Sequence, residues 1–395
     1  MQFQPSRVLA CALLGAPVLA ANGAEEGNQT WLGLDQEISN LTNSLSTQSS
    51  SANVGGVIRS SWQSIDADTG LTAGGTEDIE AFVLLDADIW VEGAEGDYSW
   101  RFNADLDGGP AGSLFGQPTP GLFQQIYGAD GFLGGSAILE DAYVSWSAND
   151  EISIVWGNFK APTSLSNHVD PENLVLIQRT IAGQSFEDWQ LGAMIQGNFD
   201  QFAGFLAVQN GADGFVDDYR ITARGEFRIN GGVGGGSGRL GAHGATTDEL
   251  AATVGVTLRD DEGASFTGGP DTTIFVIDGA LTASQFGAHA EYLALDDDIG
   301  DGNIFALTGS FAISESLEAA LRYEKVDDLN GLPIGGIANN FELDRITAGI
   351  AYIQEGARWA INISDVEADD SIGALGDDSG GLIVEVGLTV GKSRG

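Results

Sequence analysis

Tyr219–Ile229, which reads YRITARGEFRI, alternates between two kinds of side chain over its whole length. An apolar residue or a glycine stands at every odd position, and an arginine, a threonine or a glutamate stands at every even one. Because successive side chains of a β-strand point to opposite faces, the stretch predicts a strand with one apolar and one charged face. A charge that faces lipid at mid-depth costs about 2–4 kcal/mol, so in a membrane barrel the charged face must point inward.

The same alternation continues along the chain on both sides of this stretch. It is clear in Tyr98–Leu106, and in Ile79–Val91 every odd position is apolar. No apolar run reaches the roughly 20 residues that a membrane-spanning helix needs, so any spanning must be done by strands. We predict sixteen strands near residues 54–64, 79–91, 98–106, 138–146, 152–158, 189–197, 202–208, 219–229, 250–258, 273–282, 286–294, 304–312, 317–325, 346–353, 359–366 and 382–390.

The connections between these strands alternate between short and long. A half-buried strand in a soluble sandwich also alternates in polarity, so the connections distinguish the two architectures. Short periplasmic turns and long external loops are typical of an outer-membrane barrel. One connection breaks the rhythm, because Gly231–Thr247 should be a short turn and is a long glycine-rich stretch. The predicted fold is therefore an all-β, 16-stranded antiparallel transmembrane barrel over residues 54–391.

The N-terminus has the pattern of a secretory signal over residues 1–20. Arg7 provides the positive charge, and the following apolar stretch ends in small residues that suit cleavage after about Ala20. The only cysteine, Cys11, lies inside this signal, so the mature chain is predicted to contain no disulfide.

Residues 21–53 are predicted to form a periplasmic segment. Leucine or isoleucine recurs there at 4-3-4 spacing, which favours a short helix and a small coiled-coil bundle, with a plain surface helix or linker as the alternative. These residues are Leu34, Ile38, Leu41 and Leu45.

The chain is strongly acidic, with 57 acidic against 16 basic residues. Nucleic-acid binding needs a basic surface, so this excess argues against it. Every non-terminal basic residue on a strand falls on the polar face. These residues are Arg59, Arg101, Arg220, Arg224, Arg228, Arg322, Arg345 and Arg358. Tryptophans fall on apolar faces near strand ends, where interfacial aromatic girdles belong: Trp62, Trp100, Trp146, Trp156, Trp189 and Trp359.

Three short stretches resemble a known family. Residues 139–146 (LEDAYVSW), 157–165 (GNFKAPTSL) and 177–180 (IQRT) are similar to the phosphate- and polyphosphate-selective outer-membrane porins of the O and P type. The resemblance implies a 16-stranded trimeric porin whose third external loop folds into the lumen. It also implies an arginine ladder that draws anions inward.

Phe159–Ser185 is this third long loop and the best candidate for a constriction. A helix start is expected at Asp170-Pro171-Glu172, with a helix over Asn173–Ile181. Lys160 and Arg179 would supply positive charge there, and charges at a constriction set selectivity. The alternative is an external loop that caps the barrel.

Further lumen-facing charges complete the candidate site. Arg220, Arg224 and Arg228 share one strand face at about 13 Å spacing, which suits stepwise passage of an anion. The alternative is charge balance, because Glu226 lies between two of them. Arg101, Asp86 and Asp105 are also predicted to face the solute. Other acidic residues expected to project inward are Asp88, Asp141, Asp278, Glu291, Glu318 and Glu324.

Acidic clusters mark the long connections. They suit Ca²⁺ or Mg²⁺ binding that ties the loops to lipopolysaccharide phosphates, and the alternative is a solvated surface in a saline habitat. The clusters are Asp260-Asp261-Glu262, Asp296-Asp297-Asp298, Asp327-Asp328, Asp369-Asp370 and Asp377-Asp378. No resident cofactor is predicted. The three histidines lack metal-ligand spacing and no nucleophile elbow occurs, so we do not predict an enzyme.

The sequence thus predicts a homotrimeric porin in the bacterial outer membrane, in contact with lipid and lipopolysaccharide, through which small polar solutes and ions diffuse passively. An anion or phosphate preference follows from the resemblance, whereas the net charge of −41 argues for cations. One alternative is a structural or cation-binding surface protein with a plugged barrel. Another is a secreted all-β binding protein.

Overall fold

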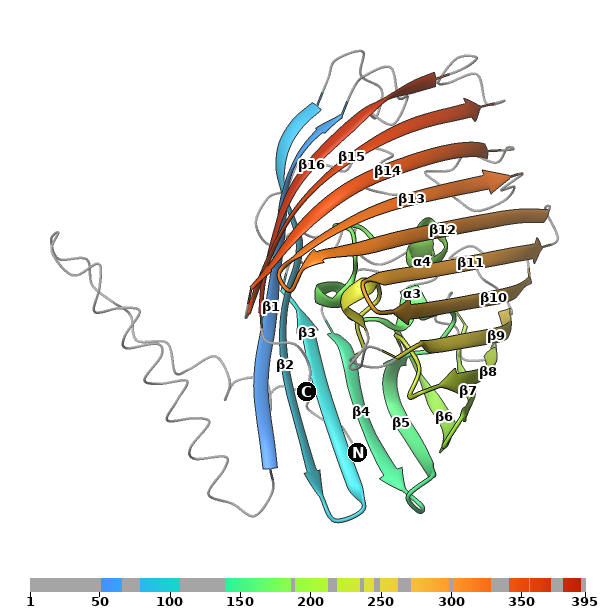
Figure 1. Cartoon of the computed structure of the whole chain (residues 1–395). Helices are drawn as coiled ribbons and strands as arrows, with labels where there is room; N and C mark the ends of the chain where they lie inside the picture. Colours follow the sequence, from blue (N-terminus) through green and yellow to red (C-terminus); the bar gives the residue numbers. More distant parts are fainter. Residues whose placement is uncertain are drawn as a thin grey trace, which may run out of the picture. The chain divides into compact units, whose positions relative to one another are not determined.

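A computed structural model describes residues 51–65, 79–106, 139–185, 189–211, 219–234, 238–244, 249–261, 271–297, 301–327, 341–354, 356–370 and 379–391. Sixteen strands, each antiparallel to its neighbours, form one closed barrel in which every strand pairs with the next along the chain (Figure 1). The first and last strands pair from Val57 opposite Gly391 to Ile65 opposite Ile383 and close the ring. Closure removes the exposed strand edges, which a sheet in lipid cannot tolerate. The predicted fold class and strand number are confirmed.

The barrel begins at Ser51 and ends at Gly391. The predicted signal and the predicted helix of residues 21–53 lie outside the described residues, apart from the start of β1. No described helix is long and apolar enough to cross a membrane. The strands are β1 (Ser51–Ile65), β2 (Ile79–Glu95), β3 (Tyr98–Asp105), β4 (Leu139–Ser147), β5 (Ile152–Lys160), β6 (Trp189–Phe199), β7 (Phe202–Asn210), β8 (Tyr219–Ile229), β9 (Ala251–Asp261), β10 (Thr272–Ala283), β11 (Phe286–Asp297), β12 (Asp301–Ser314), β13 (Leu317–Asp327), β14 (Phe341–Gln354), β15 (Ala357–Asp370) and β16 (Ser379–Gly391).

The alternation in sequence becomes two surfaces with different chemistry. On β8, the arginines at 220 and 224 are buried inside the ring, whereas Tyr219 and Ile221 are about half exposed on the outside. Phe82 and Trp156 are 81% and 70% exposed, which suits an outer wall in contact with lipid. The barrel therefore has an apolar exterior and a polar, charged interior.

A β-bulge in β2 reverses the phase of its alternation. Arg59 on β1 lies opposite Asp86, but the next residue of β1 lies opposite Leu84, so Leu85 is an extra residue. Before the bulge Phe82 points outward and Val83 is 7% exposed on the inside. The apolar odd positions between 79 and 91 therefore do not all face lipid, because one inserted residue moves the following side chains to the other face.

The two ends of the barrel differ in their connections. Two-residue turns such as Gly96-Asp97, Ser284-Gln285 and Glu315-Ser316 lie at one end, which we call the turn end. The connection between β5 and β6 leaves from the opposite end. It carries three short helical turns, α3 (Leu165–His168), η2 (Pro171–Asn173) and α4 (Ile181–Ser185). A fourth, η3 (Ala242–Gly244), lies between β8 and β9 at the turn end.

Candidate functional site

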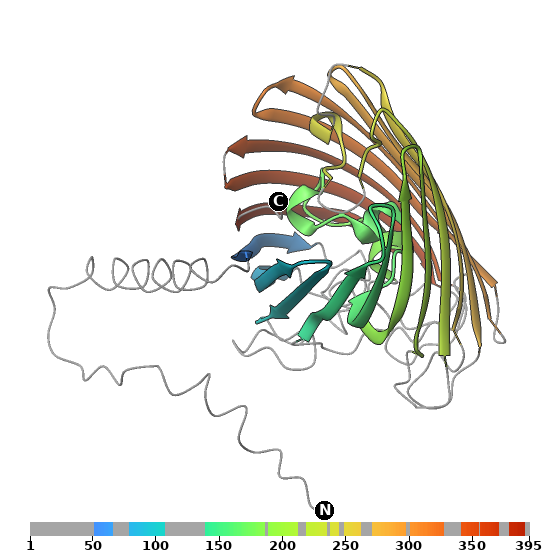
Figure 2. The same cartoon turned by 90° about the horizontal axis from the view of Figure 1, so that it is seen from below.

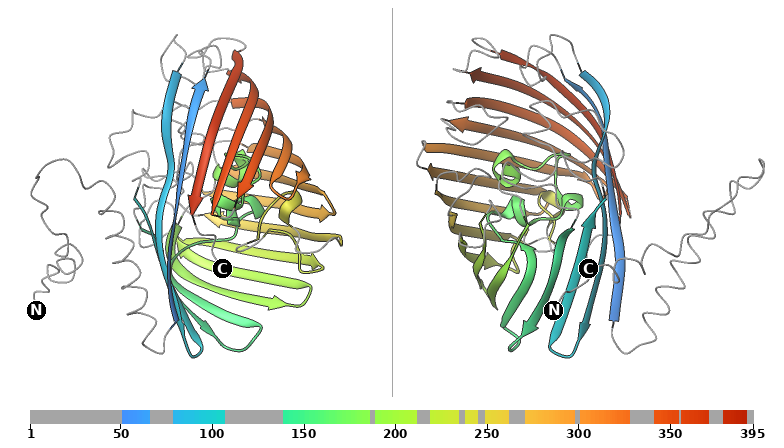
Figure 3. Two further views of the ribbon diagram at one scale, coloured as in Figure 1. Left: turned by 60° about the vertical axis from the view of Figure 1, so that its left-hand side comes forward. Right: turned by 180° about the vertical axis from the view of Figure 1, so that it is seen from behind.

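Residues 161–185, which we call the inner loop, lie inside the ring of strands (Figures 2 and 3). Most of this loop is buried, and Leu165, Leu174 and Leu176 are at most 2% exposed. Ser164 starts α3 by accepting a hydrogen bond from the backbone N–H of Asn167 at 3.2 Å, as an N-cap residue does. The loop thus occupies part of the lumen as a folded structure.

Arginines of the barrel wall bind the backbone of the inner loop. Arg322 on β13 donates from one nitrogen to the carbonyl oxygens of Gln178 at 3.0 Å and Arg179 at 2.8 Å. Three further wall arginines each donate to one loop carbonyl, Arg358 to Val175, Arg59 to Ile177 and Arg224 to Thr163.

These contacts explain why the helix predicted over Asn173–Ile181 is wrong. The 3₁₀ turn η2 ends at Asn173, the chain then runs without helix to Thr180, and α4 begins at Ile181. In an α-helix the carbonyl groups point along the helix axis. Here the carbonyl groups between Val175 and Arg179 point to the wall, where buried guanidinium groups need acceptors.

Carboxylates of the wall bind the donors of the same loop. Asp278 on β10 accepts the N–H of Leu165 at 3.1 Å, and Glu324 on β13 accepts the N–H of Ile181 at 2.7 Å. Glu291 on β11 accepts the Ser166 hydroxyl at 2.7 and 2.8 Å. Hydrogen bonds to charged groups contribute about 1.5–3 kcal/mol each, so together they hold the loop firmly on the wall.

The predicted arginine row on β8 is present, and each of its members pairs with a carboxylate. Arg220, Arg224 and Arg228 lie on the inward face of β8. Their partners are Asp261 at 2.7 Å, Asp278 at 2.7 Å and Glu226 at 2.6 Å, respectively. The side chains of the first two arginines are fully buried and that of Arg228 is 24% exposed. This arrangement favours charge balance over an anion ladder.

Arg259 and Asp261 are wall residues, although the predicted strand ended at residue 258 and placed both of them in a long connection. Strand β9 runs to Asp261 and not to residue 258, so Asp261 is a buried wall residue that pairs with Arg259 at 3.0 Å as well as with Arg220. The first acidic cluster is thus divided, and its central member is not on an external loop. Arg259 and Asp261 follow the same inward alternation as Thr253 and Thr257, so extending this alternation past residue 258 would have predicted that both face the lumen.

Lys160 and Arg179, the two positive charges predicted for the third loop, make different contacts. Lys160 ends β5 with its ammonium group 4.9 Å from the ring centroid of Trp189, a cation–π distance. Arg179 is 4% exposed and donates to the carbonyls of Ser166 and Val169 within the inner loop. Arg179 therefore braces the loop itself.

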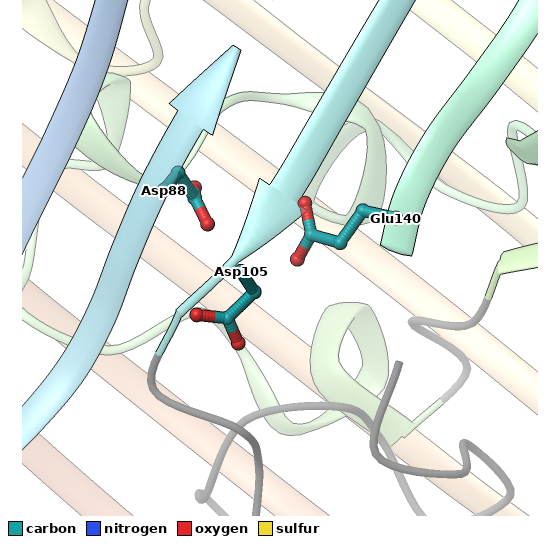
Figure 4. A group of neighbouring side chains, drawn as sticks. All are labelled: Asp88, Asp105 and Glu140. Carbon is teal, nitrogen blue, oxygen red and sulfur yellow. The ribbon is translucent and has the colours of Figure 1, made fainter. Parts of the chain in front are cut away.

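The remaining predicted residues lie on β1–β4. Asp86 pairs with Arg59, and Arg101 pairs with Asp141 at 2.9 Å. Asp105 does not join these pairs. It meets Asp88 of β2 and Glu140 of β4 (Figure 4).

We call Asp88, Asp105 and Glu140 the acidic corner. One carboxylate oxygen from each lies within 4.8 Å of the others, and the residues are 5%, 3% and 7% exposed. Asn103, which is fully buried, donates to Glu140. Three carboxyl groups this close give this part of the wall an acidic character, and their mutual repulsion disfavours three full charges at once. The acidic corner can attract cations to the β2–β4 wall.

The described wall therefore has two sides of different charge. The side from β8 to β15 carries most of the arginines, and these lie under the inner loop or in ion pairs with carboxylates. The side from β2 to β4 carries the acidic corner. The arginines of the first side are largely balanced by carboxylates, so the clustering of acidic side chains at the acidic corner is what distinguishes the two sides.

Comparison with known proteins supports the architecture. No protein-family model matches the chain, and no curated protein matches it. Among solved structures, the chain is similar to the anion-selective porin from Comamonas acidovorans, with a TM-score of 0.55, 13% identity and coverage of 87% of this chain and 100% of that one. It is similar to DcaP, an outer membrane channel of Acinetobacter baumannii (TM-score 0.54, 12% identity, 87% and 97% coverage). It is also similar to OmpT of Vibrio cholerae (0.53, 9%, 87% and 98%). The chain therefore has the fold of outer-membrane porins and channels.

Proposed function

We propose that this protein is a passive diffusion channel of the bacterial outer membrane for small hydrophilic solutes and ions. The observation that carries the proposal is a closed ring of sixteen strands with an apolar outside, a charged inside and a folded loop seated within it. A conducting lumen needs weak, distributed polar contacts and no tight site. The similar structures are described as a porin and as an outer membrane channel, which supports the same function.

We further propose that cations pass in preference to anions. Within the described wall, the arginines of β8 are paired with carboxylates, and those of β13 and β15 bind loop carbonyls. The acidic corner concentrates negative charge on the opposite wall, and the whole chain has a net charge of −41. An anion path would need arginines with donors turned to water.

The anion or phosphate preference that the family resemblance implies is the competing proposal. The name of the Comamonas protein, an anion-selective porin, points in the same direction. Purified protein in planar bilayers under a KCl gradient distinguishes the two, because the sign of the reversal potential gives the preferred ion. A reversal potential of the sign expected for K⁺ supports the cation proposal, and the opposite sign overturns it.

A plugged barrel with a structural role is the second candidate. It is favoured by the fact that segments with buried side chains enter the lumen from both ends, the inner loop from one and residues 233–234 and 238–243 from the other. Complete absence of conductance steps from folded, purified protein would support it and overturn the channel. The trimer is a proposal from the resemblance, and light scattering of the detergent-solubilised protein tests it.

A further inference from the structure

The connection between β8 and β9 does not follow the pattern of the turn end. Asn230 and Gly231 have positive φ angles of 49° and 82°, which is the backbone of a two-residue hairpin turn. Gly232 donates to the carbonyl of Ile229 at 3.0 Å, as in such a turn. The chain then continues to residue 250 before β9 begins, although Ile229 already lies opposite Ala252. We call the described residues of this connection, 232–234, 238–244 and 249–250, the glycine-rich segment.

The glycine-rich segment contacts the inner loop inside the barrel. The N–H of Leu240 donates to the carbonyl of Asn173 at 3.2 Å. Val233 and Leu240 are 1% and 3% exposed, and they share an apolar cluster with five residues of the inner loop. These are Leu165, Val169, Leu174, Val175 and Leu176. Two segments that leave from opposite ends of the barrel thus meet in the lumen.

The same segment is bound to the wall beneath it. The N–H of Ala242 donates to Glu318 of β13 at 2.7 Å and to the hydroxyl of Ser310 on β12 at 2.8 Å. Arg239 pairs with the same Glu318 at 3.4 Å. Val233 donates its N–H to the hydroxyl of Thr253 on β9 at 2.8 Å. The segment is thereby attached along β9–β13.

Glycines on both partners permit this close approach. Gly241 has a φ of 98°, and a side chain there would lie 2.5 Å from Glu318 and from Val175. On β11, a Cβ at Gly287 would lie 2.3 Å from the backbone carbon of Gly241. Gly287 therefore allows the segment's backbone to lie directly on the wall, which a larger residue would prevent.

We propose that the glycine-rich segment is a second constriction element, which narrows the lumen from the turn end and leaves the solute path on the β1–β4 side. A cavity of about 220 Å³ lies on that side, and its lining includes Asn53, Glu92, Arg101 and Tyr143. The segment fixes the largest solute that passes, and it confines ions to the wall that carries the acidic corner. This inference rests on the proposed channel function.

Deletion of residues 232–251 tests the inference. It leaves Asn230-Gly231 as a complete two-residue hairpin between Ile229 and Ala252, which already face each other. We expect at least a twofold rise in single-channel conductance and passage of larger polyethylene glycols in polymer-exclusion recordings. Unchanged conductance and an unchanged polymer limit would overturn the proposal.

A milder variant covers the case in which the deletion does not fold. In Gly241→Val the glycine-rich segment cannot lie on the wall as in the structure. The variant should therefore also let larger polyethylene glycols pass. Gly309→Val is its matched control, because a Cβ at Gly309 meets nothing within 4 Å. If the two valine variants pass polyethylene glycols of the same maximum size, the glycine-rich segment does not constrict the lumen.

Docking is tested separately by cross-linking. In a Cys11→Ser background, the variant that combines Asn173→Cys and Leu240→Cys should form a disulfide in the folded barrel, visible as a shift on a non-reducing gel. Absence of the cross-link in folded protein overturns the docking. If the wild type and the deletion both fail to conduct while the cross-link forms, the channel function is wrong and the docking stands.

Discussion

Arg224 of β8 and Asp278 of β10 form a two-point ion pair across the strand that separates them. The two guanidinium nitrogens lie 2.7 and 2.8 Å from the two carboxylate oxygens, and both side chains are fully buried. The intervening residue on β9 is Gly255, where a Cβ would lie 2.2 Å from the guanidinium and 2.5 Å from the carboxylate. Asp278 also accepts the N–H of Leu165, so this pair links two strands to the inner loop.

Gly255→Val should break this pair and loosen the inner loop. Breaking a buried ion pair costs up to about 3–5 kcal/mol. The loss here is smaller, because Arg224 keeps Glu226 as a second partner at 2.9 Å. We expect a clearly lower unfolding temperature in detergent, measured by the gel shift between folded and unfolded barrel. Gly225→Val is the matched control, because its Cβ would meet nothing within 4 Å. Equal unfolding temperatures for the two variants would contradict the role assigned to Gly255.

The sequence predicted the barrel because a period of two is a local property that survives in every strand. The inward direction of the strand arginines follows from the cost of placing a charge in lipid, so no three-dimensional knowledge was needed. The strand positions and the phase of β8 could be obtained in this way.

The parts that could not be predicted depend on contacts between distant residues. Leu85 is an extra residue only relative to β1, so its bulge is not visible in β2 alone. The non-helical run after Asn173 follows from arginines on β1, β13 and β15, more than a hundred residues away in sequence. The pairing of each arginine of β8 with a carboxylate depends in the same way on strand register.

Neutralising the acidic corner should move ion preference toward anions. Asp105→Asn removes one of three clustered charges, and adding Asp88→Asn and Glu140→Gln removes the negative potential of that wall. We expect the ratio of K⁺ to Cl⁻ permeability to fall at least twofold in the triple variant, measured from reversal potentials. Asp365→Asn removes one acidic charge on the outer face of β15, as Asp105→Asn does on the inner face of β3, and should leave the ratio unaltered. A ratio that does not respond to the triple variant would show that ions do not pass this wall.

Removal of Arg322 should destabilise the inner loop. Arg322→Ala leaves the carbonyls of Gln178 and Arg179 without this donor, and each unsatisfied buried group costs about 1–3 kcal/mol. We expect more frequent closures in single-channel records at high voltage, together with a lower unfolding temperature. Lys325→Ala on the same strand removes an exposed ion pair with Asp327, which contributes little to stability because solvent screens it. If single-channel records of Arg322→Ala show no more closures than those of Lys325→Ala, Arg322 does not hold the inner loop in place.

His168 in α3 should make the barrel less stable in acid. Burial lowers the pKa of His168 from 6.5 to about 4, and the nearby cations outnumber its one acidic neighbour. These neighbours are Glu226, Lys160, Arg224 and Arg228. As pH falls from 6.5 toward 4, the unfolded chain binds a proton at this histidine and the folded chain does not, so the free energy of unfolding decreases over that window. The shift corresponds to at most about 3 kcal/mol. The loss is smaller than this limit because the His168 side chain is only half-buried. Denaturant titrations of the wild type and of His168→Gln between pH 4 and pH 8 measure this, since only the wild type contains the histidine contribution. Parallel pH dependence of the two proteins would mean that His168 takes up its proton equally well in the folded barrel.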